Sequence, residues 1–200
     1  MLNGTIARMG FDRSHLGRYV VVTGFLVLAI AWRFIAPVLG FAPNLELLTA
    51  TSFIAAALLS PRIAWLVPLI GVAVSDLGLG NNLLLLFTWG AWIVIAIAAQ
   101  LPARISIHNR MRRLLGAVGF GIGATGFFFA VTNFGFWLLF QEFFSPGLTG
   151  LGEAYVAGLP FLANQLIGNL FLLPASGVIV DLVIRAERAG QRQVFSEHAG

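Results

Sequence analysis

The sequence contains no cysteine and no lysine, and it is poor in charge of either sign. Without cysteine the chain forms no disulfide, offers no thiolate nucleophile and cannot ligate a metal through sulfur. Only 10% of the 200 residues are charged, whereas soluble domains carry about 25%, so there is too little charge to coat a water-facing surface. The composition therefore excludes a soluble globular enzyme.

Recognised catalytic and metal-binding patterns are also missing. His15 and His198 lie in polar tails and His108 lies in an arginine-rich connector, so no two histidines share one helix face. The chain has no glycine-rich phosphate loop with a following Lys-Ser/Thr, no His-Glu-x-x-His and no serine-nucleophile motif. We therefore expect no enzymatic activity, no metal and no cofactor.

Apolar residues are abundant, at 58% of the chain with a mean hydropathy of +0.91. Their runs, with the proline and capping residues between them, predict six transmembrane helices over residues 19–38, 46–60, 61–76, 82–101, 114–140 and 160–184. Leu159-Pro160 is expected to start the sixth helix, and Pro68 and Pro174 are expected to kink the third and sixth. The predicted fold class is an all-α membrane protein with one six-helix domain over residues 19–185, between tails 1–18 and 186–200.

The arginines predict the orientation of this domain. Eleven of the twelve flank the expected helices on one side, and the connectors on the other side contain none. Because basic connectors remain in the cytoplasm, both termini are predicted to be cytoplasmic. We therefore expect a multi-pass protein of a bacterial cytoplasmic membrane. The net charge of +4 indicates topology and contact with membrane lipid, not nucleic-acid binding.

Two features of the topology stay open. The second and third helices have about 15 residues each, or about 23 Å, which is less than the roughly 30 Å hydrocarbon core. They form either two short crossings or a re-entrant hairpin that would bury Arg62. The N-terminal residues either lead into the first membrane helix or form a signal peptide with a cleavage site at Ala29-Ile30-Ala31.

Polar side chains gather in the outer halves of the expected helices. The second helix begins with Glu46 and the third ends at Asp76, whereas the cytoplasmic halves are almost wholly apolar. A polar group that faces lipid is unfavourable, so these groups are expected to face one another, water or a ligand. The sequence predicts an outward-facing polar vestibule above an apolar plug. The residues expected to line the site are Arg33, Asn44, Glu46, Asp76, Asn81, Trp89, Asn133, Trp137, Asn164 and Asn169.

Several of these residues have a structural alternative. Arg33 either pairs with Asp76 or Glu46, extends to the lipid headgroups, or binds a carboxylate or phosphate of a ligand. The asparagines within the helices either join helices by hydrogen bonds or contact a ligand. Trp89 and Trp137 belong either to an interfacial aromatic belt or to a stacking surface.

Two glycine-rich stretches also have more than one interpretation. Residues 141–159 are expected to form a flexible segment, either a plain surface loop or a cover for the vestibule. Residues 116–126 leave almost no side chain on one face of the fifth helix, so another helix of this chain or of a partner subunit can approach closely.

Short motifs at the outer ends of the helices carry a family resemblance over roughly residues 20–180. They are Pro43-Asn44-Leu45-Glu46, Ser75-Asp76-Leu77, Phe87-Thr88-Trp89, Thr132-Asn133-Phe134-Gly135-Phe136-Trp137, Leu159-Pro160-Phe161 and Gly168-Asn169. These motifs resemble an uncharacterised six-helix membrane family. That family is similar to the S components, the substrate-binding membrane subunits of energy-coupling-factor (ECF) vitamin transporters.

The resemblance implies an S-component-like bundle that captures a vitamin or related micronutrient at its outer face. It also implies delivery within a complex of a transmembrane coupling subunit and two ATPases. S components often carry Ala-x-x-x-Ala on the first helix, and Ala29, Ala31 and Ala36 do not make that spacing. Operation alone or with a dedicated partner is therefore an alternative to docking on a shared module.

The expected function is a membrane-embedded substrate-binding subunit for uptake of a vitamin-like small molecule. The alternative is a non-catalytic structural or assembly subunit of a larger membrane complex, in which the glycine face of the fifth helix makes the contact.

Overall fold

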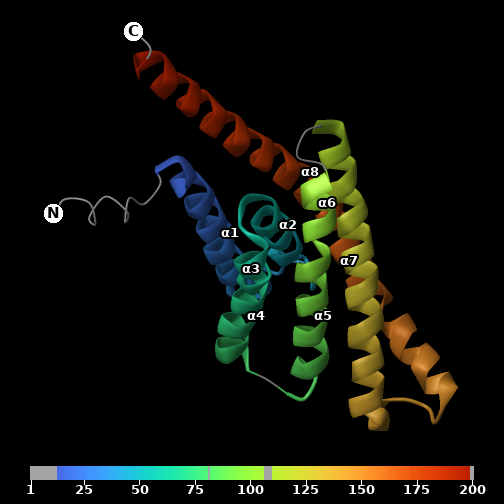
Figure 1. Cartoon of the computed structure of the whole chain (residues 1–200). Coiled ribbons are helices and arrows are strands. Elements are labelled where there is room, and N and C mark those ends of the chain that lie inside the picture. The colour runs from blue at the N-terminus through green and yellow to red at the C-terminus, as the bar shows by residue number, and fades with distance from the viewer. Residues whose placement is uncertain (1–12, 81, 106–109, 199–200) are drawn as a thin grey trace.

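The computed structural model describes residues 13–80, 82–105 and 110–198, and over these residues it is all-helical, without a β-strand (Figure 1). The elements, in chain order, are α1 (Arg13–Val38), α2 (Leu48–Leu58), α3 (Pro61–Ala64), α4 (Leu66–Leu79), α5 (Leu85–Ala98), α6 (Gln100–Ile105), α7 (Arg110–Leu139), the 3-10 turn η2 (Gln141–Phe143) and α8 (Leu148–His198). The prediction of an all-α fold is confirmed.

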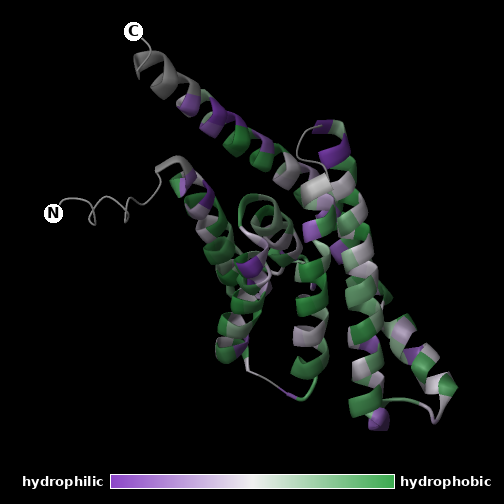
Figure 2. Cartoon of the chain, viewed as in Figure 1, coloured by the Kyte–Doolittle hydropathy of each residue, from purple (hydrophilic) through white to green (hydrophobic). Residues whose placement is uncertain are grey.

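Five helical segments are long and apolar enough to cross a membrane. They are His15–Val38, Pro61–Leu79, Leu85–Ala103, Arg110–Leu139 and Leu148–Gln191. Large apolar side chains such as Val20, Leu77 and Phe171 are exposed on their outer faces, in a quantity that soluble monomers rarely show. Figure 2 shows hydrophobic residues along most of α1, α4, α5 and α7. These features are consistent with a multi-pass membrane protein.

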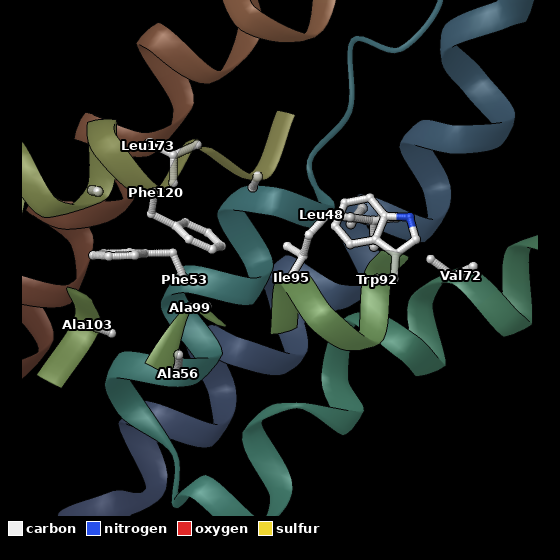
Figure 3. Packing of buried hydrophobic residues seen from close by; sticks show 13 residues of the cluster. Leu48, Phe53, Ala56, Val72, Trp92, Ile95, Ala99, Ala103, Phe120 and Leu173 are labelled. Carbon is white, nitrogen blue, oxygen red and sulfur yellow. The ribbon is translucent and has the colours of Figure 1, made fainter. Parts of the chain in front are cut away.

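The sixth apolar helix, α2, is short and lies at the centre of the bundle. It has 11 residues, of which ten are buried, and it contacts α1, α4, α6 and α8. Phe53 packs against Phe120 of α7 with ring centroids 6.2 Å apart, while Leu48 lies near Trp92 and Val72 (Figure 3). The apolar core of the protein is therefore built around α2.

Buried hydroxyl groups of α2 bond to their own helix. Thr51 and Ser52 donate to the carbonyl oxygens of Leu47 and Leu48, at 2.8 and 2.7 Å. A hydroxyl that back-bonds in this way satisfies its polar atom without a partner helix. The expectation that outer polar groups face one another, water or a ligand is therefore wrong for Ser52, whereas the Thr51 hydroxyl also lies 3.5 Å from the carbonyl oxygen of Phe25 in α1.

Prolines interrupt two of the membrane segments. Pro68 has no N–H group to donate to the carbonyl of Ala64. The break between α3 and α4 falls at Trp65, which directly follows Ala64. Pro102 likewise has no N–H group to donate to the carbonyl of Ala98, the residue at which α5 ends before α6 begins. The irregularity expected at Pro68 is thus present as a helix break, whereas α8 continues through Pro174.

The predictions of a loop over residues 141–159 and of a helix start at Pro160 are wrong. After the turn η2, α8 begins at Leu148 and continues through Pro160 to His198. Two of the glycines that suggested flexibility, Gly150 and Gly158, serve close packing in the first part of α8. A side chain added at Gly158 would meet the Asn133 amide oxygen of α7 at 2.3 Å.

Hydrogen bonds reinforce this part of α8. The Glu153 carboxylate accepts bonds from the N–H and hydroxyl of Ser145, at 2.8 and 2.6 Å. The Tyr155 hydroxyl donates to the carbonyl of Ala130 in α7, at 2.8 Å. The segment before Pro160 is therefore an ordered part of the bundle.

Ion pairs join the helices at the end of the bundle where α7 begins and α8 approaches its C-terminus. Arg18 of α1 pairs with Glu187 of α8 at 2.6 Å. Asp181 of α8 forms ion pairs with Arg113 of α7 and with Arg185 of its own helix, each at 2.8 Å. These arginines, which indicated only topology in the sequence, also fasten α8 to α1 and α7.

The small residues of α7 lie on two faces. Ala117, Gly121 and Ala124 are buried, and a Cβ at Gly121 would lie 3.0 Å from Leu173 of α8. Gly123 and Gly126 point away from the bundle, with nothing within 4 Å of an added Cβ. One face therefore packs within this chain and the other stays open.

The two kinds of glycine in α7 predict opposite responses to alanine. A Cβ at Gly135 would lie 2.3 Å from Phe87 Cγ, so we expect Gly135→Ala to lower the free energy of unfolding by about 1–3 kcal/mol through overpacking. Gly126→Ala is the matched control and should leave it unchanged or slightly raise it. Thermal unfolding of the detergent-purified proteins compares them, and equal Tm values would contradict the packing described here.

Candidate functional site

A cavity of about 630 Å³ lies at the N-terminal end of α2. Its wall is formed by the end of α1, the connector 39–47, the end of α4 and the start of α5, with one residue each from α7 and α8, Phe128 and Gln165. This volume is within the roughly 300–1,000 Å³ of small-molecule sites in proteins.

The cavity exists because the central helix is short. The 11 residues of α2 extend only about 16 Å, and at its N-terminal end the surrounding helices enclose space instead of a further turn. Leu48, Val72 and Trp92 line this space and also belong to the buried core, so the cavity has an apolar floor (Figure 3).

Glu46 caps α2 beside the cavity. Its carboxylate accepts hydrogen bonds from the backbone N–H groups of Leu48 and Thr49, from the Thr49 hydroxyl, and from Gln165 Nε2 of α8 at 3.3 Å. The first N–H groups of a helix have no partner within it, and a carboxylate there satisfies them and complements the helix dipole. Glu46 therefore stabilises the start of α2 and ties it to α8, with both of its oxygens engaged.

An ion pair joins three helices at the cavity wall. Arg33 Nη2 of α1 donates to Asp76 Oδ1 of α4 at 2.6 Å, and Trp89 Nε1 of α5 donates to Asp76 Oδ2 at 2.8 Å. Both oxygens of Asp76 are thus engaged. Arg33 reaches Asp76 through one nitrogen only, and its side chain, 24% exposed, lines the cavity.

The connector 39–47 is held in place by hydrogen bonds from α1 and α8. Trp32 Nε1 donates to the carbonyl of Leu45 at 2.7 Å, and Asn164 Nδ2 of α8 donates to the carbonyl of Pro43 at 3.1 Å. Asn44 has a φ of 62°, a left-handed conformation that asparagine adopts more readily than most residues. The connector is therefore an ordered wall that presents Asn44 to the cavity.

Residues 13–188 match a family model described as "Family of unknown function (DUF6580)". The chain belongs to this family. No curated protein and no solved structure matches it. All residues that line the cavity lie within the part of the chain that matches DUF6580.

The structure of this DUF6580 protein brings six of the ten predicted site residues together. Four line the cavity: Arg33, Asn44, Glu46 and Asp76. Two others hold the wall from outside, since Trp89 bonds to Asp76 and Asn164 bonds to Pro43. The predicted pairing of Arg33 with Asp76 is present, and ligand contact by these residues stays a prediction.

Three predicted residues lie elsewhere. Asn133 donates to the carbonyl of Phe129 in its own helix at 2.8 Å, and Trp137 packs against Phe134. Asn169 is buried and donates to Thr125 Oγ1 at 2.9 Å, which joins α8 to α7. The structure gives these residues packing roles away from the cavity. Asn81 lies outside the described residues.

Several lining residues were missed, and helical spacing was the signal that could have found them. Leu84, Leu85, Thr88 and Trp92 all line the cavity and follow one face of α5. Trp32, Phe41, Phe128 and Gln165 are among the others that were missed. Within the described parts of the DUF6580 chain, no group of three His, Asp or Glu residues is arranged to hold a metal ion.

Proposed function

We propose that this DUF6580 protein is a membrane-embedded substrate-binding subunit for the uptake of a small polar molecule of the vitamin or micronutrient class. The cavity at the N-terminal end of α2 carries this proposal. It combines apolar and aromatic walls with a few convergent polar groups, among them Arg33, Asn44 and Gln165. Sites with this composition bind small molecules and orient them through the polar groups.

The resemblance to ECF S components supports the uptake role. Two of the motifs that carry the resemblance contain Asn44, Glu46 and Asp76, and all three residues line the cavity. The proposed partners are a transmembrane coupling subunit with its ATPases, with operation alone or with a dedicated partner as the alternative. Among the described residues that line the cavity, none is a histidine or a serine that could form a nucleophile–base pair, and we propose binding without catalysis.

We further propose that the cavity opens to the outside of a bacterial cytoplasmic membrane, with both termini in the cytoplasm. Arg18, Arg113 and Arg185 lie toward the end of the bundle away from the cavity, whereas Arg33 alone lines it. The positive-inside rule places the arginine-rich end in the cytoplasm.

The absence of native cysteine allows a direct test of this orientation. Ala42→Cys, in the exposed connector, should react with a membrane-impermeant maleimide in intact cells. Ala186→Cys, exposed on α8, should react only after the membrane is permeabilised. The reverse pattern would contradict the proposed orientation.

Binding is tested by mass spectrometry of small molecules released when the mildly purified protein is denatured. We expect the wild type to release one metabolite in near-stoichiometric amount. Thr88→Trp should abolish that release, because Thr88 lines the cavity and the larger indole would fill part of it.

Thr132→Trp is the matched control, since each threonine hydroxyl bonds to a carbonyl of its own helix and Thr132 does not line the cavity. This variant should release as much metabolite as the wild type. If the two variants retain equal amounts, the ligand lies elsewhere and the proposal is wrong.

A structural or assembly subunit is the second candidate, favoured by the open glycine face of α7. Gly119 and Gly123 have the small-x-x-x-small spacing of membrane helix contacts, and both face open space. This candidate predicts a fixed set of co-purifying membrane subunits and no released metabolite from the same sample.

A further inference from the structure

Hydrogen-bond capacity is distributed unevenly around the cavity. The acidic side chains are engaged by protein donors: Asp76 by Arg33 and Trp89, and Glu46 by α2 and Gln165. An arginine has five N–H groups on three nitrogens, and Arg33 uses only Nη2. Among the described residues, none accepts a bond from Arg33 Nε or Nη1. Arg33 therefore has N–H groups without a protein acceptor, whereas each carboxylate oxygen of Asp76 and Glu46 already accepts at least one bond.

The charges that line the cavity favour a cationic ligand, whereas the unbonded donors of Arg33 favour a ligand with an acceptor group. Two carboxylates and one guanidinium line the cavity, and that count taken alone favours a cation. A cation, however, would have to share the oxygens of Asp76 or Glu46 with the donors that already bond to them, and it would approach Arg33. An acceptor group can bond to Arg33 without breaking any of these contacts. A partly buried guanidinium that is only partly paired favours such a group, and a carboxylate can accept two parallel bonds from its fork.

Aromatic side chains form part of the apolar lining, beside aliphatic ones such as Leu48 and Val72. Trp92 and Phe128 both line the cavity, with ring centroids 5.5 Å apart, and Phe41 lies on the connector side. Aromatic rings favour offset or edge contacts with other flat rings. The body of the ligand is therefore expected to be planar and apolar.

We propose that the cavity binds a planar organic carboxylate, with the carboxylate on the N–H groups of Arg33 that Asp76 leaves unbonded and the ring against Trp92 and Phe128. This assignment rests on the proposed binding function and adds a chemical class to it. Arg33 then has two roles, in which one N–H of Nη2 bonds to Asp76 and the other N–H groups of the guanidinium bond to the ligand.

Three probes with the same pyridine ring test the assignment: nicotinate, an anion; nicotinamide, which is neutral; and 1-methylnicotinamide, a cation. Binding is measured by tryptophan fluorescence and calorimetry in phosphatidylcholine nanodiscs, which carry no net lipid charge. We expect nicotinate to bind about ten-fold more tightly than nicotinamide, because a charged acceptor strengthens the bonds to Arg33. The cation should bind most weakly.

Variants separate ligand contact from a purely structural ion pair. Arg33→Gln should weaken nicotinate about ten-fold or more and remove the preference for the anion. Asp76→Asn removes the charge that competes for Arg33 and should tighten nicotinate binding. Arg62→Gln, at an exposed site on α3, removes the same charge elsewhere and should leave binding unchanged. Size-exclusion profiles and Tm values establish that each variant is folded.

The inference is overturned if nicotinamide or the cation binds as tightly as nicotinate, or if Arg33→Gln and Asp76→Asn weaken nicotinate equally. It is also overturned if no probe binds at about 10 mM, well above the Kd of even a weak complex. Should a metabolite nevertheless be released from the wild type on denaturation, the binding function stands and only the ligand class is wrong. If no probe binds and no metabolite is released, both proposals fail.

Discussion

The carboxylate of Glu46 allows the short helix α2 to begin inside the bundle. The buried core and the cavity both depend on this start. A helix N-terminus buried without partners would leave several N–H groups unsatisfied. Glu46 accepts from two of them and from Gln165, so α2 can start at Leu48 with its first turn enclosed by other helices. Because α2 is short, the space beyond its N-terminus is left as a cavity whose floor is the apolar core.

Ion pairs join helices at both ends of the bundle. At the end away from the cavity, Asp181 joins Arg113 and Arg185, which packs α8 against α7. At the cavity end, Asp76 is shared between Arg33 and Trp89, and Arg33, which lines the cavity, bonds to Asp76 through one nitrogen. A partly buried ion pair is weak evidence for stability. The incomplete pairing of Arg33 is the observation on which the proposed ligand contact rests.

Much of the helical framework followed from the apolar runs, and the Arg33–Asp76 pair followed from their opposite charges at equal depth. Depth alone does not determine which way a side chain points around its helix, and for this reason Asn133 and Trp137 were grouped with the cavity although they pack elsewhere. The start of α8 was missed because glycine is both a sign of flexible loops and a means of close helix packing. Only the neighbouring α7, with Asn133 beside Gly158, distinguishes the two.

The central claim is that the cavity at the end of α2 holds a small molecule. An experimental structure of the wild-type protein, purified in mild conditions and held in a lipid nanodisc, tests this most directly. The account predicts compact, non-protein density between Arg33 and Trp92, separate from any lipid. A cavity filled by the protein's own side chains, or by a lipid chain continuous with the bilayer, would contradict it.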